Sequence, residues 1–250
     1  MKTEIMRFVV FCVMVLFGLS GCDKPLERVK GGATMLSFTE YEKDVEPYKT
    51  RLLVTDDFMR FDDGEGSRDF ILFDRRKEVI YSVNSSDRTV MAVTRQNVKV
   101  KPPFKLNLEH KLLTDMQDAP MVAGRKPEHH QFLANGDICY DVITIPGMFP
   151  DVVEAMHVFT EILASDSAVT FNAIPADMHD ACEMSMSTFA AGRHLQFGFP
   201  VQEWSKKGSG RSLIDFQENY QVMADLFVLP KDYKHYTVQE FRDGKVSFDD

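Results

Sequence analysis

Short apolar runs alternate with polar segments over residues 48–94, and this stretch organises the chain. The apolar runs are rich in β-branched and aromatic residues, which suit a pleated sheet, and the segments between them carry the Asp, Asn, Gly and Ser residues typical of turns. The pattern predicts a five-stranded β-meander with strands at residues 48–54, 58–61, 70–73, 79–83 and 89–94. An earlier run at residues 35–41 predicts a first strand that leads into it.

The predicted meander strands are apolar on both faces. The run at 70–73 is apolar at every position, and in the run at 79–83 only Ser82 is polar. An antiparallel sheet with one face in water alternates more strictly than this. Both faces therefore need a cover, or one of them receives a ligand. The candidates for lining a ligand cavity are Phe70, Leu72, Tyr81, Val83 and Met91.

Beyond the meander, a β-hairpin is the sharpest local signal. Asn135-Gly136 separates two strand-like runs at 128–134 and 137–144, and these two residues supply the positive φ values that a type I′ turn needs.

Two helices are predicted after the hairpin. Pro150 suits the first helical turn, and apolar residues then recur at helical spacing, which predicts a helix of about 15 residues. A second helix is expected from Pro175 to about residue 190. It would place Met178, Cys182, Met186 and Phe189 on one face.

The remaining segments complete an α+β pattern. Strands are expected at 194–204 and 211–216, joined by a turn at 205–210, and a last strand at 222–229 ends before Pro230. Residues 106–118 fit either a pair of strands or a short helix.

The N-terminus has the pattern of a targeting signal. A basic start is followed by an unbroken apolar run at 8–17, too short to span a bilayer, and then by Leu19-Ser20-Gly21-Cys22. This tetrapeptide resembles the bacterial lipobox, which implies cleavage before Cys22 and lipidation of that cysteine. The alternative is an ordinary cleaved signal with an incidental cysteine.

The lipobox reading divides the chain into three parts. Residues 1–21 form a lipoprotein signal peptide, 22–33 a lipidated tether, and 34–250 a single β-rich domain with a helical insertion at about 148–191. The protein is then expected in the bacterial cell envelope, anchored to a membrane through Cys22 and facing the periplasm. Asp23 resembles an inner-membrane retention signal, but Lys24 weakens that likeness, so the choice between inner and outer membrane stays open.

Composition limits the classes of binding partner and indicates the oxidation state of the cysteines. The net charge of −9 disfavours nucleic acid and anionic headgroups as partners. Of the four cysteines, Cys12 leaves with the signal peptide and Cys22 carries the lipid. In an oxidising periplasm the remaining pair, Cys139 and Cys182, is expected to form a disulfide, and two separately buried thiols are the alternative.

Three segments together resemble the LolA/LolB-like group of bacterial envelope proteins, closest to its uncharacterised lipoprotein relatives. They are the runs DFILFDR at 69–75, VIYSV at 79–83 and FVLPKDY at 227–233. The resemblance implies an open half-barrel, a curved antiparallel sheet covered on one face by two or so helices, whose concave apolar face accepts acyl chains. The long insertion at 148–191 departs from the smaller members of the group.

Motifs that would name a reaction are missing from the sequence. It contains neither G-x-S-x-G nor H-E-x-x-H, and no cofactor or metal is expected. His129 and His130 point to opposite faces of a strand and are expected at or near the surface, and the acidic residues of the 56–65 turns are expected in water. The loop at 205–210 is expected to be a hairpin turn rather than a phosphate cradle.

Three functions fit this pattern. The leading hypothesis is a non-enzymatic, membrane-anchored lipoprotein that binds a lipid, an acyl chain or an acylated envelope partner. The second is an envelope scaffold whose cavity is filled by its own side chains. The third is a periplasmic copper-binding protein, because the segment at 178–186 combines thioethers, an imidazole and a thiol, which are ligands for Cu(I).

Overall fold

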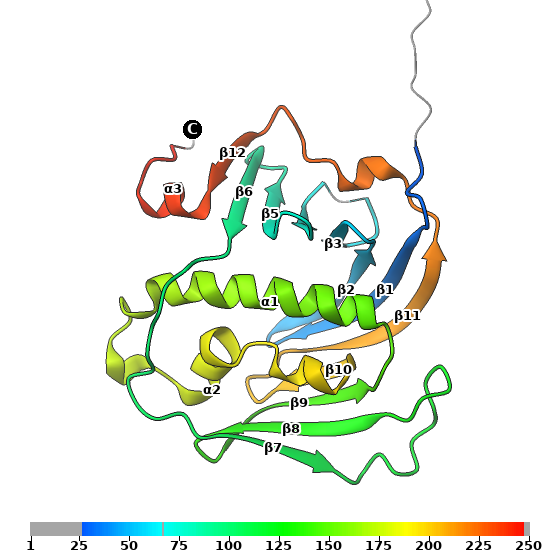
Figure 1. Ribbon diagram of the computed structural model, residues 1–250, viewed down its shortest axis with the longest axis vertical. Helices are drawn as coiled ribbons and strands as arrows, with labels where there is room; N and C mark the ends of the chain where they lie inside the picture. Colours follow the sequence, from blue (N-terminus) through cyan, green and yellow to red (C-terminus); the bar gives the residue numbers. More distant parts are fainter. Residues whose placement is uncertain (1–26, 67, 248–250) are drawn as a thin grey trace, which may run out of the picture.

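The computed structural model describes residues 27–66 and 68–247, which form one open 12-stranded sheet with a long helix and several short helical segments (Figure 1). The predicted signal peptide and the predicted lipidation site, Cys22, lie outside the described residues. In chain order, the strands are β1 (Ala33–Glu42), β2 (Val45–Val54), β3 (Phe58–Asp62), β4 (Phe70–Asp74), β5 (Val79–Asn84), β6 (Thr89–Thr94), β7 (Leu108–Leu113), β8 (Glu128–Ala134), β9 (Asp137–Ile145), β10 (Phe199–Ser205), β11 (Gly210–Tyr220) and β12 (Lys234–Thr237). The helices are α1 (Pro150–Phe171), α2 (Ala181–Met184) and α3 (Val238–Arg242).

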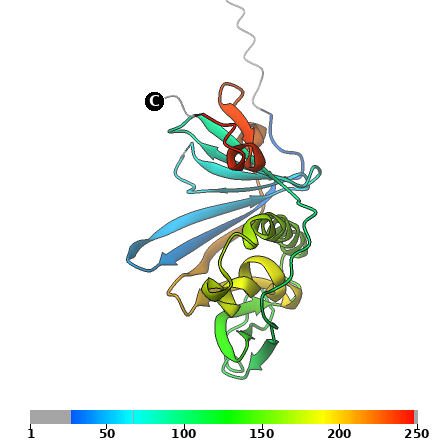
Figure 2. The ribbon, with the colours of Figure 1, turned by 90° about the vertical axis from the view of Figure 1, so that its left-hand side faces the viewer.

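The sequence predicted an antiparallel sheet, but the sheet of the structure is mixed. Its strand order is β12-β6-β5-β4-β3-β2-β1-β11-β10-β9-β8-β7, and the neighbours are antiparallel except for β12, which pairs in parallel with β6. A hairpin forces antiparallel pairing, whereas the long path from β6 to β12 leaves the direction of the last strand free. Figure 2 shows the sheet bending around the side that carries α1 and α2.

Helix α1 fills the inside of this bend. Val152, Ala155, Met156 and Ile162 are buried there, together with core residues of strands from both halves of the sheet. The predicted helix is confirmed, but it has 22 residues because Ala168 and Phe171 extend its buried stripe. It therefore stabilises the curvature of the sheet.

The strand predictions are confirmed where local patterns are strong. The five meander strands form β2 to β6, and the hairpin at Asn135-Gly136 joins β8 to β9 with both turn residues at positive φ. Residues 106–118 contain a single strand, β7, which pairs with β8.

The second predicted helix is wrong. Between residues 175 and 190 the chain forms a 3₁₀ turn, Ala176–Met178, then the single-turn α2, then a π-helical turn, Ser185–Phe189. Asp180 caps α2 by accepting a hydrogen bond from the Glu183 amide, so a new helical start interrupts the expected face. Met178 is 70% exposed, whereas Met184, which was not on the expected face, is 2% exposed.

The strand expected at 194–204 begins later than predicted. Residues Arg193–Phe197 form a 3₁₀ turn, and β10 starts after Gly198. Gly198 has φ 134°, and a Cβ there would lie 2.6 Å from the carbonyl oxygen of Ile145. Only glycine allows this close crossing between the insertion and β9.

The strand expected at 222–229 is also wrong. This segment contains a 3₁₀ turn, Ala224–Phe227, and packs on the sheet instead of joining it. The expected tether is shorter than predicted, because Arg28 forms a bridge with Met223 and the Val29 amide donates to the Val222 carbonyl. Val29 packs its apolar side chain against the cluster that contains Val222 and Phe227, and this contact fixes the chain next to the 222–229 segment.

Candidate functional site

The five residues proposed to line a ligand cavity lie on both faces of the meander. Phe70 pairs with Val83 and Leu72 with Tyr81, so these four share one face. Met91 pairs with Ser82 and lies on the opposite face, in the core beneath α1. The sequence could not separate them because both parities are apolar.

The chain's own C-terminal segment covers the face that carries Phe70 and Leu72. Val222 and Phe227 are buried against it, and the Phe227 ring stacks on Phe58 with centroids 5.6 Å apart. These candidates therefore pack in a core, and they line none of the cavities described below.

A buried arginine on β3, Arg60, binds this C-terminal segment to the sheet. Arg60 is 5% exposed; its Nε donates to Asp62 Oδ2 at 2.7 Å and its Nη1 donates to the Leu226 carbonyl at 2.6 Å. Its guanidinium lies 3.7 Å from the centre of the Phe70 ring. Asp62, expected in water, is buried and also accepts two hydrogen bonds from Arg51. Burial alone raises the pKa of Asp62, but the hydrogen bonds from the two arginines outweigh it and hold that pKa below its usual range.

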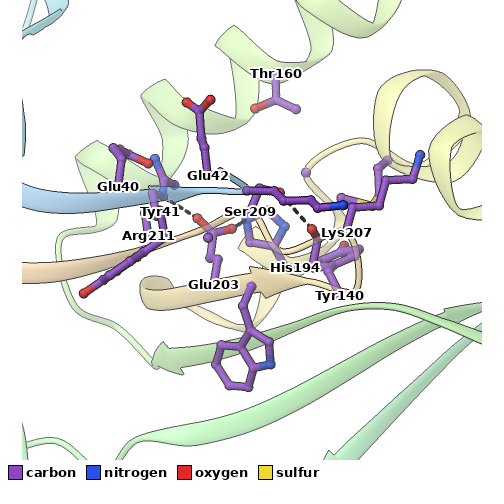
Figure 3. A pocket seen from close by; sticks show the side chains of 16 residues that line it. Glu40, Tyr41, Glu42, Tyr140, Thr160, His194, Glu203, Lys207, Ser209 and Arg211 are labelled. Atoms are coloured by element: carbon purple, nitrogen blue, oxygen red, sulfur yellow. Dashed lines mark hydrogen bonds and ion pairs between the residues drawn. The ribbon is translucent and has the colours of Figure 1, made fainter. Parts of the chain in front are cut away.

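A cavity with several charged lining residues lies on the other side of the sheet, where the helical insertion meets the tips of two hairpins. It has a volume of about 590 Å³, and an adjoining pocket of about 550 Å³ shares Met186, Ser205, Lys207 and Ser209 with it. We call the two together the insertion groove. The larger part is lined by Glu40, Tyr41, Glu42, Lys43, Tyr140, Thr160, Met186, Gly192, His194, Glu203, Trp204, Ser205, Lys207, Ser209, Gly210 and Arg211 (Figure 3). The smaller part adds Asp137, Ile138, Cys139, Asp180, Cys182, Glu183, Lys206 and Ser187.

Charged side chains form the floor of the groove. Glu40, Arg211 and Glu203 are direct neighbours on β1, β11 and β10, so they form a row of alternating charge on one face. Arg211 Nε donates to Glu203 Oε2 at 2.5 Å, and His194 Nε2 lies 3.0 Å from Glu203 Oε1. Figure 3 shows this cluster below Thr160, a residue of α1 that faces the floor from the opposite side of the groove.

The state of Glu203 is set by its two basic neighbours. Burial alone raises its pKa, but the charges of Arg211 and His194 outweigh that effect and lower the pKa to about 2. Glu203 is therefore a carboxylate at neutral pH. Neither ring nitrogen of His194 has a well-directed hydrogen-bond partner among the described residues.

We expect Glu203→Gln to destabilise the protein at pH 7 and to destabilise it by less than half as much at pH 3. The pKa of Glu203 is about 2 when folded and near 4.5 as a free side chain, so its contribution to stability is complete above pH 4.5 and is lost as the pH falls toward 2. Urea unfolding of both proteins at pH 7 and pH 3 measures this. Glu218→Gln, at an exposed position on β11, is the control. An equal difference in stability at both pH values contradicts the assignment.

The walls of the groove offer apolar surface above this floor. Met186 and Tyr140 supply it from the insertion and β9, and burial raises the pKa of Tyr140 to about 12, so that its hydroxyl stays protonated. Apolar walls with a few convergent polar groups are typical of small-molecule sites. The arrangement can hold an apolar chain against the walls and a polar group against the floor.

Other candidate ligands in the sequence are separated or already paired. The structure joins Cys139 to Cys182 with an S–S distance of 2.04 Å, so Cys182 offers no thiolate to copper, and Met178 and Met184 differ in exposure. No three His, Cys, Asp or Glu side chains of the described residues gather in a group that could hold a metal ion.

The two adjacent histidines are both buried, against expectation. His130 stacks with His110 and lies 2.8 Å from it between Nδ1 and Nε2, while His129 contacts Asp115 and Asp141. Strand β7, whose existence the sequence left open, supplies the partner that covers His130. These rings thus serve the packing of the sheet edge.

Sequence reasoning missed the floor of the groove. Glu203 and Arg211 lie symmetrically about the turn at 205–210, and this spacing across a hairpin is the one signal that could have paired them. His194 is brought there by a 3₁₀ turn that no periodicity predicts.

Comparisons with known proteins add no family. The chain matches no protein-family model and no curated protein. The crystal structure of an uncharacterized conserved protein from Thermus thermophilus aligns with 83% of this chain and 91% of its own, at 9% identity and a TM-score of 0.40. Two crystal forms of PNGF-II align with 84% and 85% of this chain, at 8% and 7% identity and TM-scores of 0.43 and 0.40.

The sequence identities and TM-scores of these structures are too low to inform on function. The chain spans only 32% and 33% of the length of PNGF-II in the two forms. None of the structures named bears on the LolA/LolB-like resemblance, which stays a prediction. No helix of the described residues is long and apolar enough to cross a membrane.

Proposed function

We propose that the protein is a lipid-anchored component of the bacterial cell envelope that binds an apolar or acyl-bearing ligand, or an acylated envelope partner, in the insertion groove. The observation that carries this proposal is the groove itself, whose larger part of about 590 Å³ reaches the tips of the β1–β2 and β10–β11 hairpins at Lys43 and Lys207. Small-molecule sites typically have volumes of roughly 300 to 1,000 Å³. The N-terminal lipobox supports the anchor and the periplasmic location.

The groove replaces the meander as the proposed binding surface. The two meander faces are occupied, one by α1 and the other by the C-terminal segment. An amphipathic ligand fits the groove better than a wholly apolar one, because a polar group on the ligand compensates for the charged floor of Glu203 and Arg211.

A structural scaffold is the second candidate. It is favoured by the same filled meander faces, which need no ligand for stability. The two functions differ in one observable: a scaffold leaves the insertion groove unoccupied in the cell.

A matched pair of methionine substitutions tests the ligand site. Met186 lines both parts of the groove, so Met186→Trp should fill it and weaken binding of a fluorescent fatty acid by at least about tenfold, or about 1.4 kcal/mol. Met178→Trp introduces the same side chain at an exposed position of the same insertion that lines neither part. Fluorescence titration of the three proteins gives the affinities. Equal affinity in all three proteins contradicts the site, and no uptake by the wild type contradicts the function.

A further inference from the structure

The disulfide between Cys139 and Cys182 lies in the wall of the insertion groove. Both cysteines line its smaller part, a pocket of about 550 Å³ that is open to solvent. We propose that this disulfide is a reversible redox site, reduced in the folded protein by a protein dithiol, and that its reduction releases one wall of the groove. The consequence for ligand binding rests on the function proposed above, whereas the redox site does not.

The two cysteine residues differ in exposure. Cys139 is 3% exposed on β9, within a small cluster that includes Phe132 and Tyr140. Cys182 lies at the outer side of this cluster, on α2, and is only partly buried. An incoming thiolate therefore reaches Cys182 Sγ first.

Reduction is a two-electron exchange of thiols. A thiolate of the reductant attacks Cys182 Sγ and forms a mixed disulfide, while the original S–S bond breaks and Cys139 leaves as a thiolate that takes up a proton. The second thiol of the reductant then attacks the mixed disulfide and releases Cys182. The reductant ends as a disulfide and the protein holds two thiols.

The segment held by Cys182 has little regular structure of its own. α2 is a single turn, Ala181–Met184, and a π-helical turn and a 3₁₀ turn follow it. Isolated helices of such lengths are unstable in water, so tertiary contacts and the covalent link hold the segment in place. At the start of the segment, Ala181 and Cys182 pack against the cluster on β8 and β9. Its end is held separately, because Arg193 donates to the Leu133 carbonyl and Leu195 is buried in the core beneath α1.

The same segment forms part of the groove. Met186, Gly192 and His194 follow Cys182 in the chain and line the larger cavity. Loss of the disulfide therefore frees the part of this wall that carries Met186, whereas His194 keeps its ring contacts with Phe132 and Tyr140. Sheet residues on the floor keep their places because strand pairing holds them.

The first test asks whether the disulfide is reduced in the folded protein. The full-length oxidised protein is treated with excess dithiothreitol at several urea concentrations below its unfolding transition, and free thiols are trapped by alkylation and counted by mass spectrometry. We expect a reduction rate that does not change with urea, since the bond is reached through the pocket. A rate that rises with urea in parallel with global unfolding overturns the proposal.

The second test follows the wall itself by hydrogen exchange. At exchange times short enough that residues 70–83 of the meander stay protected in both states, reduction should speed exchange at residues 181–188 by at least about tenfold. Unchanged exchange at 181–188 overturns the proposal, and so does equal loss of protection in both regions. Fluorescent fatty acid binding by the oxidised protein is measured in parallel. If the oxidised protein binds none, the proposed function fails while the redox result stands by its own two measurements.

Discussion

Replacing Arg60 with alanine is expected to lower the free energy of unfolding by about 3 kcal/mol, the low end of the range for breaking a buried ion pair. The side chain is 5% exposed and contacts Asp62, the Leu226 carbonyl and the Phe70 ring at once. Its loss removes one of the two cations that bind buried Asp62, which keeps Arg51 and the Gly64 amide as partners, and it leaves a carbonyl on the C-terminal cover without its donor. Urea unfolding monitored by circular dichroism measures the change.

Arg76→Ala is the matched control for Arg60→Ala. Arg76 also pairs with an aspartate, Asp57, but its side chain is 75% exposed, and such surface pairs contribute at most about 1 kcal/mol. The two variants should therefore differ clearly. Equal effects contradict the view that Arg60 fastens the segment 222–229 to the sheet.

Replacing both Cys139 and Cys182 with serine should have the largest effect on stability. The bond joins residues 43 positions apart, and closure of such a loop stabilises a protein by roughly 4 kcal/mol in the chain-entropy model. The loss should appear as a lower urea midpoint with a larger m-value, because the unfolded chain is more expanded without the cross-link. The oxidised wild type is the reference, and the reduced wild type should match the double variant.

This comparison separates the bond from the side chains. If the double variant is as stable as the oxidised protein, the disulfide does not constrain the chain and the account of the insertion is wrong. If the variant is less stable than the reduced wild type, the serines themselves disturb the cluster around Tyr140.

The sequence predicted the elements whose signals are local. The Asn135-Gly136 turn and the apolar stripe that follows Pro150 led to the correct hairpin and the correct long helix. The meander was equally clear, because every strand is bounded by turn residues. These signals depend on neighbours in the chain and need no tertiary information.

Elements that depend on distant contacts were not predicted correctly. The segment 222–229 has a strand-like composition, but Arg60 and the apolar face of β4 and β5 hold it as a cover. The helix expected at 175–190 is broken where Asp180 caps a new turn, close to the disulfide-bonded Cys182. Tertiary contacts overrode local preference in both segments.

The candidate site shows the same division. A need to cover both meander faces was a sound deduction, and the structure covers them with α1 and the C-terminal segment. The groove was not foreseen, since its floor joins Glu40, Glu203 and Arg211 through strand register between β1, β11 and β10. Register between strands so distant in sequence leaves no periodic signal.

Native mass spectrometry of the protein extracted from membranes in mild detergent tests the central claim most directly. The account predicts a noncovalently bound lipid or acyl species on the wild type and on Met178→Trp, and its loss from Met186→Trp, whose indole fills the groove. A wild-type protein that is consistently empty, and that also takes up no fluorescent fatty acid, would contradict it.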